Sequence, residues 1–173
     1  MVFLVIITKT LIKEKPAYIN LHTHGVSEEV QDALLQRAEE EPNSTLHTSN
    51  MVPLPITISG KIESVDDTDF FRFVAKKGQR LICDVNASRI GSPLDSFLTL
   101  FGPDGGKVAS NDIANGLDSL IDYTIPEDAE GEYTLQIRDL RYKGGEQFVY
   151  RLRIGELPYL DSIFPLGGRR GME

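Results

Sequence analysis

The chain has 173 residues, 40% of them hydrophobic and 8% aromatic, and its 18 Lys and Arg against 26 Asp and Glu give a formal net charge of −8. This length and composition fit one globular domain with tails and exclude a chain that is disordered throughout. The acidic balance argues against a nucleic-acid partner, because affinity for phosphate backbones comes from Lys and Arg.

The longest apolar run is VFLVIIT, residues 2–8. It is far shorter than the ~20 residues that a membrane-spanning helix needs, so we expect no membrane span and interpret the run as a β-strand or as a remnant of a larger chain. The single cysteine, Cys83, excludes an intramolecular disulfide. The fold must therefore depend on packing or on a bound ion.

The segment after Ser27 has the pattern of a short amphipathic helix. Ser27 is a suitable N-cap, acidic residues follow it, and apolar side chains recur at Val30, Ala33, Leu34 and Ala38. Pro42 would end this helix. We therefore predict an N-terminal extension with a short helix over residues 1–38.

From residue 54 onward the hydrophobic period changes to two, and turn residues recur every eight to twelve positions. This rhythm predicts an all-β antiparallel sandwich, jelly-roll-like, of seven or eight strands, with no helix longer than a turn. The expected strands cover residues 56–62, 69–74, 80–87, 97–101, 120–124, 131–139 and 147–154. Alternation places Cys83 with the core residues, where a free thiol behaves as a small hydrophobe.

The polar residues offer little for catalysis. Histidine occurs only at positions 22, 24 and 47, away from any nucleophile motif. Asp95, Asp112 and Asp118, with Asn111, form a polar set over three predicted loops, which fits ordinary turns better than a metal site. An acid–base pair from these aspartates would need a carboxyl with a pKa raised by burial, and loops keep carboxyls in water. We expect no enzymatic activity.

Carboxylates form the one informative group. Glu39, Glu41 and Asn43 alternate before the first sandwich strand, and Asp66, Asp67 and Asp69 crowd the turn after it. Like charges at this density repel one another unless water or a cation neutralises them. Calcium accepts six to eight oxygens of these types. A calcium site and a solvated acidic turn both remain open at this point.

Six motifs occur in order along the chain: EEEPN at 39–43, DDTDFFRF at 66–73, AKKGQR at 75–80, GSPLDS at 91–96, ASND at 109–112 and GEYTL at 131–135. In this order the set resembles the bacterial pre-peptidase C-terminal domain, a β-sandwich often attached to secreted proteases and similar to the collagen-binding domains of collagenases. The resemblance implies a non-catalytic module and an exported or extracellular protein.

The resemblance also implies ligands for calcium, since the collagenase relatives bind this ion through their opening acids and the turn after the first strand. By position, the matching residues here are Glu39, Glu41, Asn43, Asp66 and Asp69. One residue departs from the pattern, because Ser44 stands where the family has Asp. That change removes a charge, and we expect it to weaken the site.

Our leading hypothesis is an accessory module for binding or spacing over residues 39–155, followed by a linker or strap over 156–173 that connects to a neighbouring domain or protein. The alternative is a domain that recognises an extracellular polymer, either a collagen-like protein or a polysaccharide. It would use a predicted basic hairpin at 137–153, with Arg141, Tyr142 and Lys143 near its tip.

Overall fold

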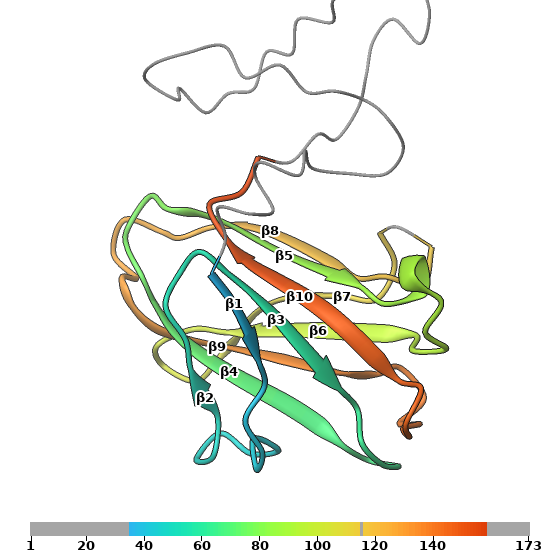
Figure 1. Ribbon diagram of the computed structural model, residues 1–173. Helices are drawn as coiled ribbons and strands as arrows, with labels where there is room; N and C mark the ends of the chain where they lie inside the picture. Colours follow the sequence, from blue (N-terminus) through green and yellow to red (C-terminus); the bar gives the residue numbers. More distant parts are fainter. Residues whose placement is uncertain (1–34, 115, 159–173) are drawn as a thin grey trace, which may run out of the picture. The chain divides into compact units, whose positions relative to one another are not determined.

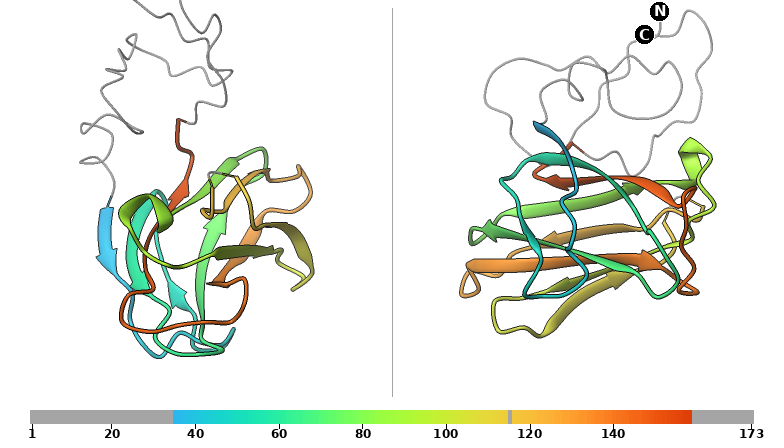
Figure 2. Two further views of the ribbon diagram at one scale, coloured as in Figure 1. Left: turned by 90° about the vertical axis from the view of Figure 1, so that its right-hand side faces the viewer. Right: turned by 60° about the horizontal axis from the view of Figure 1, so that its bottom comes forward.

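The computed structural model describes residues 35–114 and 116–158. These residues form two five-stranded sheets that pack face to face (Figures 1 and 2). The first sheet, sheet A, has the order β1 (Leu35–Ala38), β3 (Ile56–Lys61), β10 (Val149–Gly155), β5 (Arg80–Asn86) and β8 (Leu120–Thr124). The second, sheet B, has the order β2 (Asn50–Met51), β4 (Thr68–Ala75), β9 (Gly131–Asp139), β6 (Ser96–Phe101) and β7 (Lys107–Asn111).

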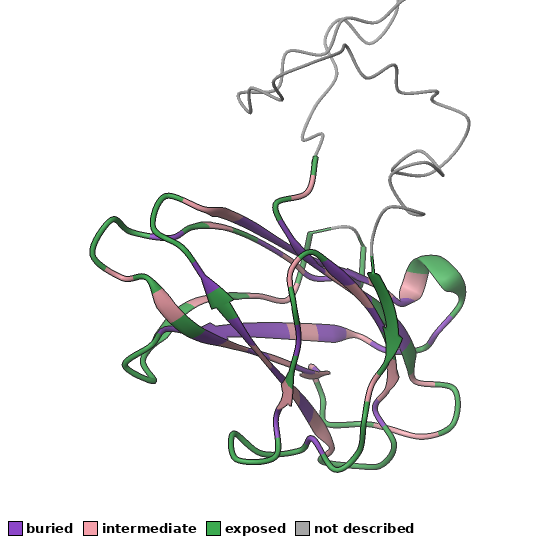
Figure 3. Ribbon diagram, turned by 60° about the vertical axis from the view of Figure 1, so that its left-hand side comes forward, coloured by how far each residue is buried: buried purple, intermediate pink, exposed green. Residues whose placement is uncertain are grey.

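Alternating side chains build one hydrophobic core between the sheets. Strands β4 and β9 pair over eight residues and bury every second side chain. Their inward residues include Phe71, Phe73, Leu135 and Ile137, none of which is exposed to solvent. Figure 3 shows that the buried residues follow the strands while the connecting loops are exposed. The all-β sandwich is therefore confirmed.

Cys83 lies in this core with no solvent exposure, as the alternation predicted. Burial, and then the nearby charge of Asp84, raises the pKa of its thiol to about 12. Within the described residues, the single helix is the short 3-10 turn η1 (Ser88–Ile90). No helix in that part of the chain has the length and apolar character needed to cross a membrane.

All seven predicted strands are present, with ends that differ by at most two residues. The sequence analysis missed β1, β2 and β7, which lie at sheet edges. Their residues are mostly exposed, so hydrophobic alternation does not mark them.

The predicted helix after Ser27 is wrong over Leu35–Ala38. These residues form β1, which pairs in parallel with β3 and extends sheet A to a point before the predicted boundary at Glu39. All four are exposed, so pairing with the free edge of β3, and not burial of an apolar stripe, decides their conformation. The remainder of that helix, the run at 2–8 and most of the linker predicted at 156–173 lie outside the described residues.

The predicted hairpin at 137–153 is also wrong, because β9 lies in sheet B whereas β10 lies in sheet A. Residues 140–148 cross from one sheet to the other. The backbone explains this course, since Gly145 donates a hydrogen bond to the Ile62 carbonyl and Ile62 donates one to the Phe148 carbonyl. The crossing loop is thus attached to the end of β3.

Candidate metal centre

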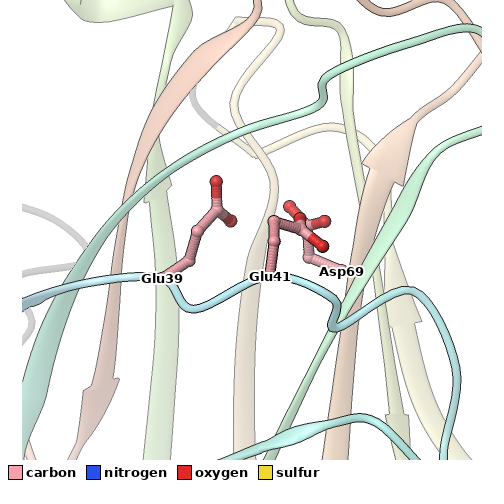
Figure 4. Close-up of side chains that lie close together, drawn as sticks. All are labelled: Glu39, Glu41 and Asp69. Carbon is pink, nitrogen blue, oxygen red and sulfur yellow. The ribbon is translucent and has the colours of Figure 1, made fainter.

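Three of the predicted ligands come together in space. One carboxylate oxygen from each of Glu39, Glu41 and Asp69 lies within 4.8 Å of the others. Figure 4 shows the three side chains, two of them on the segment that follows β1 and the third on β4. Since β1 belongs to sheet A and β4 to sheet B, the group joins the two layers of the sandwich.

Glu39 is held in place by β3. Its backbone N–H donates to the Ser59 carbonyl at 3.0 Å, and the Lys61 N–H donates to Glu39 Oε1 at 2.7 Å. Gly60 lies between these two contacts. A Cβ at Gly60 would stand 2.4 Å from Glu39 Oε2 and 2.3 Å from the Tyr150 hydroxyl oxygen. Only glycine therefore leaves room for this carboxylate and the phenol beside it.

Tyr150 is the member of the site that the sequence analysis missed. It is 1% exposed, and its hydroxyl oxygen lies 2.7 Å from Glu39 Oε2 and 2.6 Å from Asp69 Oδ2. A hydroxyl carries one proton and can donate to only one of these carboxylates at a time. Burial, followed by the charge of Glu39, raises the pKa of Asp69 to about 9. Without a cation, a proton on Asp69 satisfies the second contact by donating to Tyr150.

A signal for Tyr150 was present in the sequence. Alternation in the last strand places Tyr150 on the inward side with Leu152, and a buried phenol needs a hydrogen-bond partner. Burial and the charge of Asp69 raise the pKa of Tyr150 well above its ordinary value, so the phenol remains a neutral donor.

The side-chain amide of Asn43 offers a further oxygen atom beside these carboxylates. It is fully buried, its N–H donates to Glu41 Oε2 at 2.9 Å, and its carbonyl accepts from the Phe70 N–H at 3.0 Å. Neither polar atom of its side chain has a hydrogen-bond partner, and Asp69 Oδ1 also lacks one. Buried polar atoms without partners are costly, and a bound ion is one of the explanations for them.

The turn acids divide into two kinds. Asp66, predicted as a ligand, is exposed, has a φ of 67° and is not one of the grouped carboxylates. Asp67 lies nearer to the grouped carboxylates. Its Oδ1 accepts a hydrogen bond from the Ser44 hydroxyl at 3.3 Å, on the segment that carries Glu41. Burial, partly offset by the Asn43 N–H and reinforced by the charge of Asp67, raises the pKa of Glu41. Ser44 thus contributes a hydroxyl where the resembling family has a carboxylate.

The second polar set does not form a comparable site. Asp118 is fully buried and accepts from the backbone N–H groups of Ala87, Ser88 and Arg89, as well as from Arg89 Nε at 2.7 Å. Its carboxylate therefore holds η1 in place. Among the described residues, the group at Glu39, Glu41 and Asp69 is the only one that brings three acidic, His or Cys side chains together.

The predicted polymer-binding residues Arg141, Tyr142 and Lys143 are exposed on the crossing loop. Arg141 lies 4.0 Å from Asp95, and its side chain is 71% exposed. Tyr142 has a φ of 57° and stacks its ring on the guanidinium of Arg138, 4.2 Å from the ring centroid. The structure places the three residues together but adds Arg138, which the sequence analysis did not single out.

Comparison with protein families supports the resemblance. The model of the bacterial pre-peptidase C-terminal domain matches residues 67–139. The matched segment runs from the residue before β4 to the end of β9. Of the candidate ligands, only Asp69 lies inside the matched segment of the pre-peptidase C-terminal domain, since Glu39, Glu41 and Asn43 precede it.

One relative of the chain is a probable subtilase-type serine protease from Deinococcus radiodurans, which is 46% identical over 72 residues. The aligned part is 41% of this chain and 10% of the protease, so the chain spans about a tenth of that relative's length.

Two solved structures are similar to the chain. The pre-peptidase C-terminal domain of a Bacillus anthracis collagenase matches with 18% identity and a TM-score of 0.49, covering 67% of this chain and 99% of that one. A periplasmic inhibitor of g-type lysozyme from Aeromonas hydrophila matches with 22% identity and a TM-score of 0.47, covering 61% and 95%.

Proposed function

We propose that this pre-peptidase C-terminal domain is a calcium-ordered accessory module without catalytic chemistry of its own. The observation that carries the proposal is the convergence of Glu39 and Glu41, from the segment after β1, with Asp69 of β4, beside buried polar atoms that have no partner. Glu39, Glu41, Asp69 and the Asn43 side-chain oxygen would hold the ion. Its charge would replace the proton on Asp69 and fix the segment after β1 to β4.

The chemistry of the donors favours calcium over other metals. All the candidate ligands are hard oxygens from carboxylates and an amide, and the group contains no His or Cys. Zinc and copper prefer nitrogen and sulfur, and magnesium demands a regular octahedron of closely spaced ligands. Calcium tolerates an irregular set, which suits ligands on an irregular segment and on a strand.

The role of such an ion would be mechanical. The segment at 39–43 leaves β1 in sheet A and contacts β4 in sheet B, so fixing it would hold β1 in place and restrict the direction from which a preceding domain is joined. In this proposal the module serves for spacing or binding within a larger exported protein, next to a neighbouring domain. The alignment of this chain with one tenth of a probable protease supports a role as one module of a larger protein.

Thermal unfolding of metal-stripped protein, with calcium titrated in, tests the proposal. Binding to the folded state alone adds about 2.7 kcal/mol at a calcium concentration of 100 Kd. For a domain of this size that is a rise in Tm of roughly 10 °C. We expect Glu41→Gln and Asp69→Asn to lose the rise.

Glu40→Gln is the matched control, since Glu40 is exposed in the same segment and its side chain has no part in the group. It changes the net charge by the same amount and should respond to calcium as the wild type does. The proposal would be refuted by a wild type that shows no rise, or by a rise that Glu41→Gln and Asp69→Asn both retain.

A further inference from the structure

A single arginine on the outer face of sheet B is held in an unusual way. The side chain of Arg138 points outward from β9, because its neighbours Ile137 and Asp139 are buried. Its guanidinium carbon lies 4.3 Å from the centroid of the Phe97 ring and 4.2 Å from that of Tyr142. Aromatic side chains from two different elements therefore contact the same guanidinium.

The hydrogen bonds of Arg138 use only part of the guanidinium. Nη1 donates to the carbonyls of Asp139 at 2.8 Å and Leu140 at 3.2 Å. Nε and Nη2 have no partner among the described residues, and neither is one of the buried atoms without a partner, so both keep some exposure to solvent. Two stacked rings and two carbonyls thus fix the group and leave one edge of it free.

The same edge binds carboxylates elsewhere in this protein. Arg80 donates from Nε and Nη2 to the two oxygens of Asp122, and Arg153 donates from Nε and Nη2 to Asp84. This two-bond pairing with an oxyanion is the geometry that a planar guanidinium favours. At Arg138 the edge is already oriented, so a ligand would lose little side-chain entropy in binding there.

The surroundings of Arg138 are basic in an acidic protein. Arg141 and Lys143 are exposed on the adjoining loop, and the acids that contact this loop include Asp139, Asp95 and Asp66. Asp139 is buried and accepts the N–H groups of Arg141 and Lys143, and Asp95 lies 4.0 Å from Arg141. Asp66, whose N–H donates to the Tyr142 carbonyl, is the exposed acid of the neighbouring turn.

The face around Arg138 carries side chains that suit a sugar polymer. In the register of sheet B, Arg138 lies between Thr68 and Phe97, and Gln136 lies between Phe70 and Thr99. The next row of residues that face outward from the sheet consists of Arg72, Thr134 and Phe101. Phe70, Phe97 and Phe101 are each half-buried, so part of each ring is available beside amide, hydroxyl and guanidinium groups.

The position of β9 argues for a polysaccharide over a peptide. Peptides that bind sheets usually add a strand to an open edge through main-chain hydrogen bonds. Strand β9 is the middle strand of sheet B, and β4 and β6 occupy both of its sides. A ligand on this face meets side chains only, and aromatic rings with amides and hydroxyls match the C–H faces and hydroxyls of sugars.

We infer that Arg138, in contact with the rings of Phe97 and Tyr142, is the centre of a binding site for the carboxylate or sulfate groups of an acidic polysaccharide. The site goes beyond the proposed calcium module and does not depend on it, since none of the candidate cation ligands belongs to it. Arg141 and Lys143 add positive charge at its border.

Binding of fluorescent hyaluronan, which carries carboxylates, and of heparin, which also carries sulfates, tests the inference and separates the two oxyanions. Neutral dextran and poly-glutamate are the comparison ligands. We expect at least one acidic glycan to bind, and Arg138→Lys to weaken that binding at least tenfold, because an ammonium cannot reproduce the two-bond edge. Arg151→Gln, an exposed arginine on sheet A, removes one charge and should change the affinity less than twofold.

A second readout uses the wild type and does not depend on the stability of a variant. The ¹⁵Nε–H signal of Arg138, assigned by its absence in Arg138→Lys, should shift on titration with the bound glycan, in EDTA as well as in calcium. The inference is overturned if no acidic glycan binds, if poly-glutamate binds as tightly, or if Arg151→Gln loses as much affinity as Arg138→Lys. Binding that requires calcium, or an unmoved Arg138 signal, would also overturn it.

Discussion

The metal-stripped protein should lose stability as the pH rises, and the reason is the proton on Asp69. Burial and the charge of Glu39 raise the pKa of this carboxyl from 3.8 to about 9. Between these values the folded state holds a proton that the unfolded chain has released. Its contribution is fully present below pH 3.8 and is lost progressively as the pH approaches 9, which is the reverse of an ion-paired carboxylate.

The size of the effect follows from the same two values. Each pH unit inside the window costs up to about 1.4 kcal/mol, so moving from pH 5 to pH 8 costs up to about 4 kcal/mol from Asp69 alone. The raised pKa of Glu41 acts in the same direction. A loss near this bound would be a large part of the about 5–15 kcal/mol that stabilises a typical domain.

Urea unfolding in EDTA at several pH values measures this loss directly. The wild type should become less stable from pH 5 to pH 8, whereas Asp69→Asn, which cannot release a proton, should show a much flatter profile. Saturating calcium should remove most of the wild-type slope. A metal-free wild type whose stability is constant or rises over this range would refute the protonation of Asp69.

Three further predictions follow from single contacts. Gly60→Ala places a Cβ 2.3 Å from the Tyr150 hydroxyl oxygen, so it should cost about 1–3 kcal/mol and abolish the calcium-dependent rise in Tm, and an unchanged melt would contradict the close contact. Asp118→Ala leaves three backbone N–H groups and the Nε of Arg89 without their acceptor and should lower the Tm by roughly 10 °C, corresponding to about 3 kcal/mol, whereas Asp112→Ala should shift it little. Cys83, with a pKa of about 12 and no exposure, should not react with a thiol reagent at pH 8 until urea unfolds the protein, and fast labelling of the folded protein would contradict its place in the core.

Hydrophobic alternation was enough to predict the strands that carry the core. In β9 each of Tyr133, Leu135 and Ile137 is buried while the residues between them are more exposed, so the period of two is complete. The pattern fails where a strand has no buried face. Strand β1 is exposed at all four residues, and its conformation comes from backbone pairing with β3, which leaves no trace in the identity of its side chains.

The placement of β9 and β10 in different sheets could not be predicted from the sequence, for a similar reason. Strands β9 and β10 are consecutive and separated by a short glycine-rich segment, which is typical of a hairpin. Their separation into different sheets depends on the hydrogen bonds that Ile62, more than 80 positions earlier in the chain, makes with Gly145 and Phe148. The local turn signal could not reveal this contact.

The candidate metal centre shows both what sequence patterns can reveal and what they miss. Its acids were visible because carboxylates at this density need neutralisation, but the sequence could not separate Asp69, which is buried in the group, from Asp66, which is exposed. Tyr150 lies 111 positions from Glu39 and decides the chemistry of the site, because its one hydroxyl proton faces two carboxylates. The group must therefore hold an additional proton or a cation, and the exchange of one for the other ties the fixing of residues 39–43 to both pH and calcium.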